Sequence, residues 1–125
     1  MRPERETKSY GVINPIGLEM VADGYRDKTL QPRDLLVLFA LIKEVGVMTG
    51  QCWTNAHVAV QGMGHNMDAG SVSKGLKRLR EADLVRRFYS PRHKQYWYAV
   101  NPRVVGFGTP DAQRKLWEKW QADKI

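Results

Sequence analysis

The residue types that most often carry catalysis or bind metals are few and scattered in this chain. Cys52, His57, His65 and His93 are the candidates for a nucleophile or a metal ligand, and they lie in separate segments. Their spacing matches no zinc pattern. A nucleophilic pair of Cys52 and His57 would need an orienting group and an oxyanion site, and the sequence indicates neither. We therefore expect no enzyme activity, no metal and no cofactor.

A second kind of chemistry, the attraction of phosphate groups, is indicated between Lys74 and Lys94. Eight Lys or Arg residues in this segment stand against Glu81 and Asp83, so it holds most of the net charge of +7. A concentrated basic surface favours phosphate partners and makes binding depend on salt. The alternative is a solvated basic surface without a partner.

The composition is typical of one folded domain in a reducing compartment. The chain has 125 residues, and 42% of them are hydrophobic. Cys52 is its only cysteine, which excludes an internal disulfide. No apolar run is long enough to span a bilayer, and the first residues lack the core of a signal peptide. We expect a cytoplasmic protein, associated with the nucleoid or a plasmid, that contacts no membrane.

The elements that position the basic segment follow from apolar spacing. Residues 1–9 are predicted to be a flexible N-terminal arm, and residues 10–125 a single domain. A β-hairpin is expected over 10–21, because Pro15 and Gly17 interrupt an apolar run. A central helix should begin at Pro32 and end near Gly46. Its predicted core-facing residues are Leu35, Leu38, Phe39, Ile42 and Val45, broadened by Leu36 and Leu41.

Two more helices and a second hairpin are predicted to follow. A brief helix, capped by Thr54 or Asn55, should run to about Gln61 with Val58 pointing inward. Asp68 should cap a third helix. Its predicted core face is Val72, Leu76 and Leu79, and its opposite face Ser71, Lys74, Lys77, Arg78 and Glu81. Residues 84–89 and 95–100 are β-prone and should form a hairpin with a basic tip.

This order of elements is typical of a winged helix-turn-helix. The predicted fold is α+β, mainly α, with a two-stranded basic wing and an additional C-terminal helix. We expect the third helix to enter the major groove of double-stranded DNA and the wing to contact the backbone. The predicted contacts on the helix are Asp68, Ala69, Gly70, Ser71, Ser73, Lys74, Lys77 and Arg78. Those on the wing are Arg86, Arg87, Arg92, His93 and Lys94.

Residues 71–87 resemble the recognition helix and first wing strand of many bacterial winged-helix proteins. Residues 96–108, with Asn101 and Pro102 at the hairpin exit, resemble plasmid replication initiators of the RepL type, and the resemblance covers roughly residues 25–120. It implies a protein of a plasmid, phage or other mobile element that binds its origin or its own control region. Asp83 departs from the glycine common at the helix-to-strand turn, although aspartate tolerates left-handed geometry.

A final helix is predicted over 110–122, with Thr109 as its cap. Leu116, Trp117 and Trp120 should share one face, together with Gln113. This face either packs on the first helix of the same chain or forms a homodimer interface. A homodimer is expected because a two-fold protein matches a palindromic site.

Three functions remain open from the sequence. The first is sequence-specific DNA binding by a replication initiator that recruits host replication machinery. The second is a transcriptional regulator, such as a repressor, that acts on the transcription machinery. The third is a winged-helix module that binds protein and not DNA. For the first two, Lys74, Lys77 and Arg92 should set affinity for all sequences, and Ser71 and Ser73 should set specificity.

Overall fold

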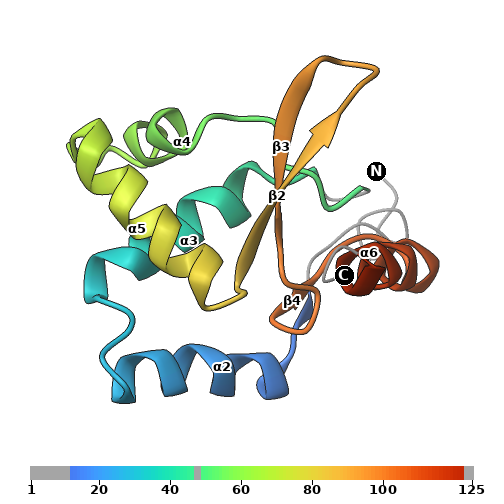
Figure 1. Cartoon of the computed structure of the whole chain (residues 1–125), viewed down its shortest axis with the longest axis horizontal. Helices are drawn as coiled ribbons and strands as arrows, with labels where there is room; N and C mark the ends of the chain where they lie inside the picture. The colour runs from blue at the N-terminus through green and yellow to red at the C-terminus, as the bar shows by residue number, and fades with distance from the viewer. Residues whose placement is uncertain (1–11, 47–48, 123–125) are drawn as a thin grey trace, which may run out of the picture.

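The structure, a computed structural model, describes residues 12–46 and 49–122. The predicted N-terminal arm, residues 1–9, lies outside the described residues. Within them the chain is α+β and mainly helical, with five helices and two antiparallel strand pairs (Figure 1). No helix in these two ranges is long and apolar enough to cross a membrane.

Helices α3, α4 and α5 pack together as the centre of the fold. They span Pro32–Glu44, Ala56–Gly62 and Ala69–Glu81. The central helix starts at the predicted residue, because Pro32 gives up an amide that would have had no intrahelical partner. The amide of Gln31 donates to Asp34 Oδ2 at 2.8 Å and fixes the first turn.

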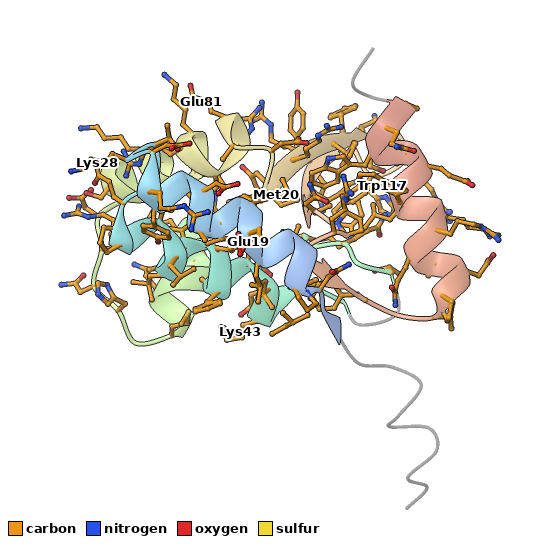
Figure 2. All side chains as sticks on the ribbon, turned by 90° about the horizontal axis from the view of Figure 1, so that it is seen from below. Glu19, Met20, Lys28, Lys43, Glu81 and Trp117 are labelled. Carbon is orange, nitrogen blue, oxygen red and sulfur yellow. The ribbon has the colours of Figure 1, made fainter. Side chains whose placement is uncertain are left out.

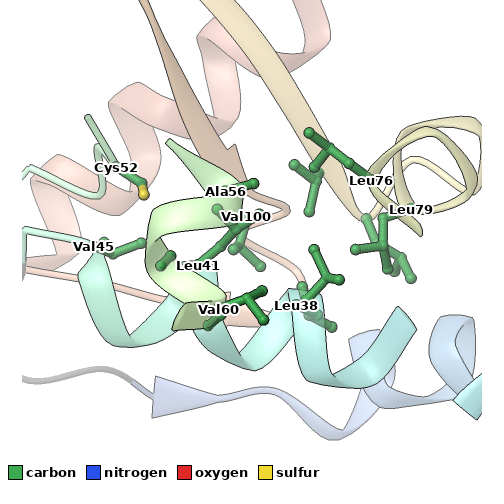
Figure 3. Packing of buried hydrophobic residues seen from close by; sticks show 14 of the residues in the cluster. Leu38, Leu41, Val45, Cys52, Ala56, Val60, Leu76, Leu79 and Val100 are labelled. Carbon is green, nitrogen blue, oxygen red and sulfur yellow. The ribbon is translucent and has the colours of Figure 1, made fainter. Parts of the chain in front are cut away.

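The core lies between these three helices and the base of a hairpin. Leu38 and Leu41 of α3 pack with Val60 of α4 and with Leu76 and Leu79 of α5 (Figure 3). The predicted core face of the third helix is therefore confirmed, and Val72 is buried with it.

The core-facing side of α3 differs from the predicted one. Val37 and Ala40 are fully buried, whereas Phe39, which was expected to face the core, is 51% exposed. The reason is that α3 packs mainly against α4 and α5, on the side that carries Val37. Phe39 instead borders an apolar groove of about 560 Å³, which Ile13 and Leu18 also line.

Helix α4 is held by Asn55 at its start. The Asn55 side chain accepts hydrogen bonds from the amides of His57 and Val58, at 2.8 and 3.4 Å. The expectation that Val58 points inward is wrong, because its side chain is 54% exposed. Ala59 and Val60 are buried instead, and the small alanine lets α4 approach α3 closely.

The hairpin predicted over 10–21 is wrong for the residues that the structure describes. Only Val12–Ile13 is extended, as β1, and it pairs with β4, Val105–Gly106. Helix α2, Pro15–Arg26, follows directly. Proline at 15 starts this helix and does not form a turn. A Cβ on Gly17 would lie 1.8 Å from the carbonyl oxygen of Arg103, so this glycine permits close packing.

Strands β2, Val85–Ser90, and β3, Gln95–Val100, form the predicted antiparallel hairpin. The turn from α5 into β2 places Asp83 at a φ of 61°, the left-handed conformation expected at this position. On the other edge of the hairpin, Cys52 and Tyr98 exchange two backbone hydrogen bonds of 2.8 Å. This bridge ties the segment before α4 to β3.

Helix α6, Pro110–Ala122, covers one face of the hairpin. Its cap is the predicted one, since Thr109 Oγ1 accepts a hydrogen bond from the amide of Ala112 at 3.2 Å. The expectation that its tryptophans pack on the first predicted helix, which is α3 in the structure, is wrong. Trp120 is fully buried in a cluster with Phe88 and Trp97. Trp117 of α6, labelled in Figure 2, is half-buried beside that cluster. The apolar partner of α6 is the aromatic face of the hairpin, formed by Phe88 and Trp97.

Candidate nucleic-acid interface

The first turn of α5 is organised by Asp68. Its Oδ1 accepts a hydrogen bond from the amide of Ser71 at 2.7 Å. This hydrogen bond lowers the pKa of the Asp68 carboxyl, so the cap is negatively charged at neutral pH. Asp68 therefore has a structural role at the helix start. Ala69 and Gly70 are exposed beside it, and Ser71 is half-buried.

The solvent face of α5 carries a row of exposed polar residues, a stripe that runs parallel to the row of buried apolar residues on its other face. Val72, Leu76 and Leu79 are buried, and the residues one position later in each case are exposed. These exposed residues are Ser73, Lys77 and Arg80, at the i, i+4 and i+7 spacing of one helix face. Lys74 is also exposed next to this stripe.

Arg78 does not lie on that stripe, although it was predicted to contact DNA. It donates from Nε and Nη2 to the two carboxylate oxygens of Asp34, each at 2.7 Å. Asp34 is fully buried, and its hydrogen bonds raise the pKa of Arg78. This charge is neutralised inside the fold and is not available to a phosphate.

Arg80 is the cation that the sequence reasoning did not single out as a contact. With Lys77 of the same helix and Arg87 of β2 it lines an open groove of about 710 Å³, which Glu81 and the largely buried Arg86 also line. Helical spacing in the sequence could have identified Arg80. It follows the core residue Leu79 by one position, as Lys77 follows Leu76, so Arg80 and Lys77 share one face. The structure thus brings residues of the helix and the hairpin to one groove.

The two neighbouring arginines of β2 have different environments because successive strand residues point to opposite faces. Arg87 is exposed, and its guanidinium lies 4.3 Å from the centre of the Tyr96 ring. Arg86 was also predicted to contact DNA, but its side chain is only 16% exposed and forms an ion pair with Asp83 at 2.8 Å. It also lies 4.5 Å from the centre of the Trp120 ring, so it joins the hairpin to α6.

The hairpin tip is an ordered, exposed turn. Arg92, His93 and Lys94 are all exposed, as predicted, and Lys94 adopts a φ of 53°. His93 Nδ1 and Ser90 Oγ are joined by a hydrogen bond of 2.9 Å. The His93 ring also lies 4.9 Å from that of Trp53. These contacts hold the tip so that two cations project from it.

The predicted dimer residues of α6 are largely engaged within the chain. Trp120 is fully buried, and its Nε1 donates to Asp83 Oδ2 at 3.3 Å. A second copy cannot reach this side chain in the folded protein. Leu116 and Trp117 are half-buried, and Arg103 lies 5.4 Å from the centre of the Trp117 ring.

The candidates for other chemistry are not brought together. Cys52 is buried, and burial raises the pKa of its thiol, so it is protonated and unreactive at neutral pH. His57 Nε2 lies 3.0 Å from the carbonyl oxygen of Met67, and His93 is at the hairpin tip. In the part of the chain that the structure describes, no three His, Cys, Asp or Glu residues are grouped so as to hold a metal.

Comparisons of this chain with protein-family models, with curated proteins and with solved structures found no match. The similarity of residues 71–87 and 96–108 to winged-helix and RepL-type proteins therefore stays a prediction.

Proposed function

We propose that the chain is a winged-helix protein that binds double-stranded DNA, with α5 in the major groove and the β2–β3 hairpin on the sugar-phosphate backbone. One observation carries the proposal: Lys77 and Arg80 of α5 share a groove with Arg87 of the hairpin. Cations from two elements, placed side by side, suit the repeated phosphates of a duplex.

The unpaired charge on this surface supports a polyanionic partner. We call it the α5–hairpin surface, and its members are exposed cations of α5, β2 and the tip. Among the described residues, no carboxylate forms an ion pair with any of them. The members of the α5–hairpin surface are Lys74, Lys77, Arg80, Arg87, Arg92 and Lys94. By contrast, Arg78 and Arg86 are paired and serve the fold.

The shape of α5 also suits groove entry. A major groove admits one helix, and its N-terminal residues must come closest to the base edges. Ala69 and Gly70 are small and exposed, and Ser73 is the exposed hydroxyl one turn later. Ser73 is therefore the side chain of this helix that we expect to read sequence.

Replication initiation or its control, on a plasmid or phage, is the setting that we favour, because it is the one that the RepL-type resemblance implies. Such a protein would bind repeated sites near an origin. A transcriptional repressor of the winged-helix class would instead bind one operator. Footprinting on the chain's own upstream region separates the two, since it counts the protected sites.

The proposal is tested by fluorescence anisotropy with random duplex DNA at two salt concentrations. We expect binding that weakens with salt. The slope of the logarithm of the binding constant against the logarithm of salt concentration should fall in magnitude by about one in Lys77→Ala or Arg80→Ala, because each removes one phosphate contact. Arg26→Ala is the matched control, because it removes the same charge from an exposed residue of α2. No binding at low salt, or an equal effect of all three substitutions, would refute the proposal.

A further inference from the structure

We propose that Tyr89 and Tyr96 form a stacking surface for unpaired bases, so that the hairpin also binds single-stranded DNA. This goes beyond duplex binding, in which neighbouring base pairs cover the faces of the bases. The two tyrosines face each other across the hairpin, with ring centres 5.0 Å apart and planes at 64°.

The strand register places this pair on the face of the hairpin whose base packs against the helices. Val85 and Val100 are paired at the base of that face and are buried against the helices. Because alternate residues share a face, Arg87 and then the pair of Tyr89 and Tyr96 follow further out. The tyrosines thus lie beyond the core, on the same strand as the Arg87 that lines the groove shared with α5.

Packing within the fold does not account for the exposed area of these rings. The hairpin's other large aromatic pair, Phe88 and Trp97, is 6% and 5% exposed under α6. Tyr89 and Tyr96 are 51% and 50% exposed. Their edge-to-face contact stabilises the hairpin, but it leaves half of each side chain in water.

The charges around the pair favour a polyanion as the partner. The Arg87 guanidinium already lies 4.3 Å from the centre of the Tyr96 ring, and Arg92 and Lys94 follow at the tip. Residues 84–108 contain no Asp or Glu, so nothing on the hairpin itself repels phosphates. Aromatic rings interleaved with cations are the usual surface for single strands, because every base has a face that can stack.

The test compares fluorescein-labelled oligothymidylate, oligouridylate and duplex DNA of equal length by anisotropy. For the protein with Tyr89→Ala and Tyr96→Ala together, we expect oligothymidylate affinity to fall by about tenfold or more. Duplex affinity should fall clearly less, because Arg87 loses its contact with the Tyr96 ring but keeps its charge. The matched control carries Tyr89→Phe and Tyr96→Phe, which keep the rings and remove the hydroxyls. It should bind as the unaltered protein does, whereas phosphate contacts through the hydroxyls predict a loss.

Several outcomes would overturn the inference. If the unaltered protein binds duplex but not oligothymidylate, the stacking surface is refuted and duplex binding stands. If it binds oligothymidylate through the tyrosines but no duplex, the proposed function fails and this inference stands. Tighter binding of oligouridylate than of oligothymidylate would refute the assignment to DNA. An unchanged affinity after the double alanine substitution would leave the exposed pair as a protein-docking surface.

A second measurement needs no substitution and does not depend on how the variants fold. A single strand containing 5-iododeoxyuridine is photo-crosslinked to the unaltered protein, which is then digested with trypsin. Cleavage at Arg and Lys releases Tyr89 in residues 88–92 and Tyr96 in residues 95–103. We expect the crosslink in one of these two peptides, and crosslinks found only elsewhere would contradict the inference.

Discussion

Arg78 of α5 and Asp34 of α3 form a two-pronged ion pair in which both hydrogen bonds measure 2.7 Å. Asp34 is fully buried, and its Oδ2 also accepts the amide of Gln31 at the start of α3. One carboxylate therefore fixes both the first turn of α3 and the distance from α3 to α5. Since α5 is the proposed recognition helix, this pair orients the α5–hairpin surface without belonging to it.

The first prediction concerns the stability that this pair supports. Arg78→Met leaves the Asp34 charge buried with a single remaining donor, so we expect a loss of about 3 kcal/mol in the free energy of unfolding. The double variant Arg78→Met with Asp34→Asn should lose less unfolding free energy than the sum of the two single variants, because it leaves no unpaired charge buried. Urea unfolding measures all three.

An exposed ion pair on α6 provides the control for this experiment. Arg114 pairs with Asp111, and their side chains are 64% and 55% exposed. Arg114→Ala should change the unfolding free energy by less than about 1 kcal/mol. Equal losses from the two arginine substitutions would contradict a special role for Arg78.

The second prediction uses two glycines of the same helix. A Cβ on Gly75 would lie 3.0 Å from Asp34 Oδ1 and 3.3 Å from Val37 Cγ2. Both residues are fully buried, and Asp34 is held by Arg78, so making room means shifting packed side chains. Gly75→Ala should therefore destabilise by about 1–3 kcal/mol despite the better helix propensity of alanine. At Gly70 the nearest atom, Asp68 Oδ1, is at 3.5 Å.

Gly70→Ala is thus the matched control and should be neutral or stabilising in thermal unfolding. A stabilised Gly75→Ala protein would show that α5 can move away from α3, which would contradict the role of Asp34 in fixing their distance.

The third prediction separates Arg78 from Arg80, which are two residues apart on α5. Arg80→Ala should leave the melting temperature unchanged. It should lower the salt slope of duplex binding by about one, because one phosphate contact is lost. Arg78→Lys keeps the charge but loses the two-pronged geometry, so it should lower the melting temperature and leave the salt dependence unchanged. Anisotropy titrations at several salt concentrations and thermal melts decide this, and a reversed pattern would contradict it.

Much of the fold follows from short-range signals in the sequence. Pro32, Asn55, Asp68 and Thr109 each mark a helix start that the structure confirms, because capping depends on neighbouring residues alone. The hairpin was equally predictable from β-prone runs on either side of Pro91.

The errors arise where distant contacts decide the outcome. Proline and glycine at 15 and 17 fit a turn as well as a helix. In the structure Pro15 starts α2 and Gly17 lies against the backbone of Arg103, a contact that the local sequence does not reveal. Likewise, a charged Asp34 gives no sign of burial until Arg78, 44 residues later, is placed against it. The inward positions of Arg78 and Arg86 in the candidate site depend on such partners, so charge counting alone could not separate them from Arg80.

The fourth prediction is a pH dependence that comes from Asp68. The Ser71 amide lowers the pKa of this carboxyl in the folded protein, so the cap stabilises above the unfolded pKa, near 4, and is lost as pH falls through the folded value. Asp68→Ala should lower the melting temperature at pH near 7, and the difference from the unaltered protein should shrink toward pH near 3. Asp68→Asn caps without a charge, so the deficit should be nearly absent at neutral pH. A deficit of Asp68→Ala that does not change with pH would contradict the capping role.

The last prediction distinguishes the two tryptophans of α6. Trp120 is fully buried against Phe88 and Trp97, so Trp120→Ala should cost about 3–5 kcal/mol in unfolding free energy. Trp117 is only half-buried, and Trp117→Ala should cost clearly less, because less apolar area returns to water. Urea unfolding gives both values, and sedimentation velocity on the same samples reports self-association. If α6 joined two copies, Trp117→Ala would dissociate them while the chain stayed folded. Equal losses of stability from both substitutions would show instead that Trp117 belongs to the cluster under the hairpin.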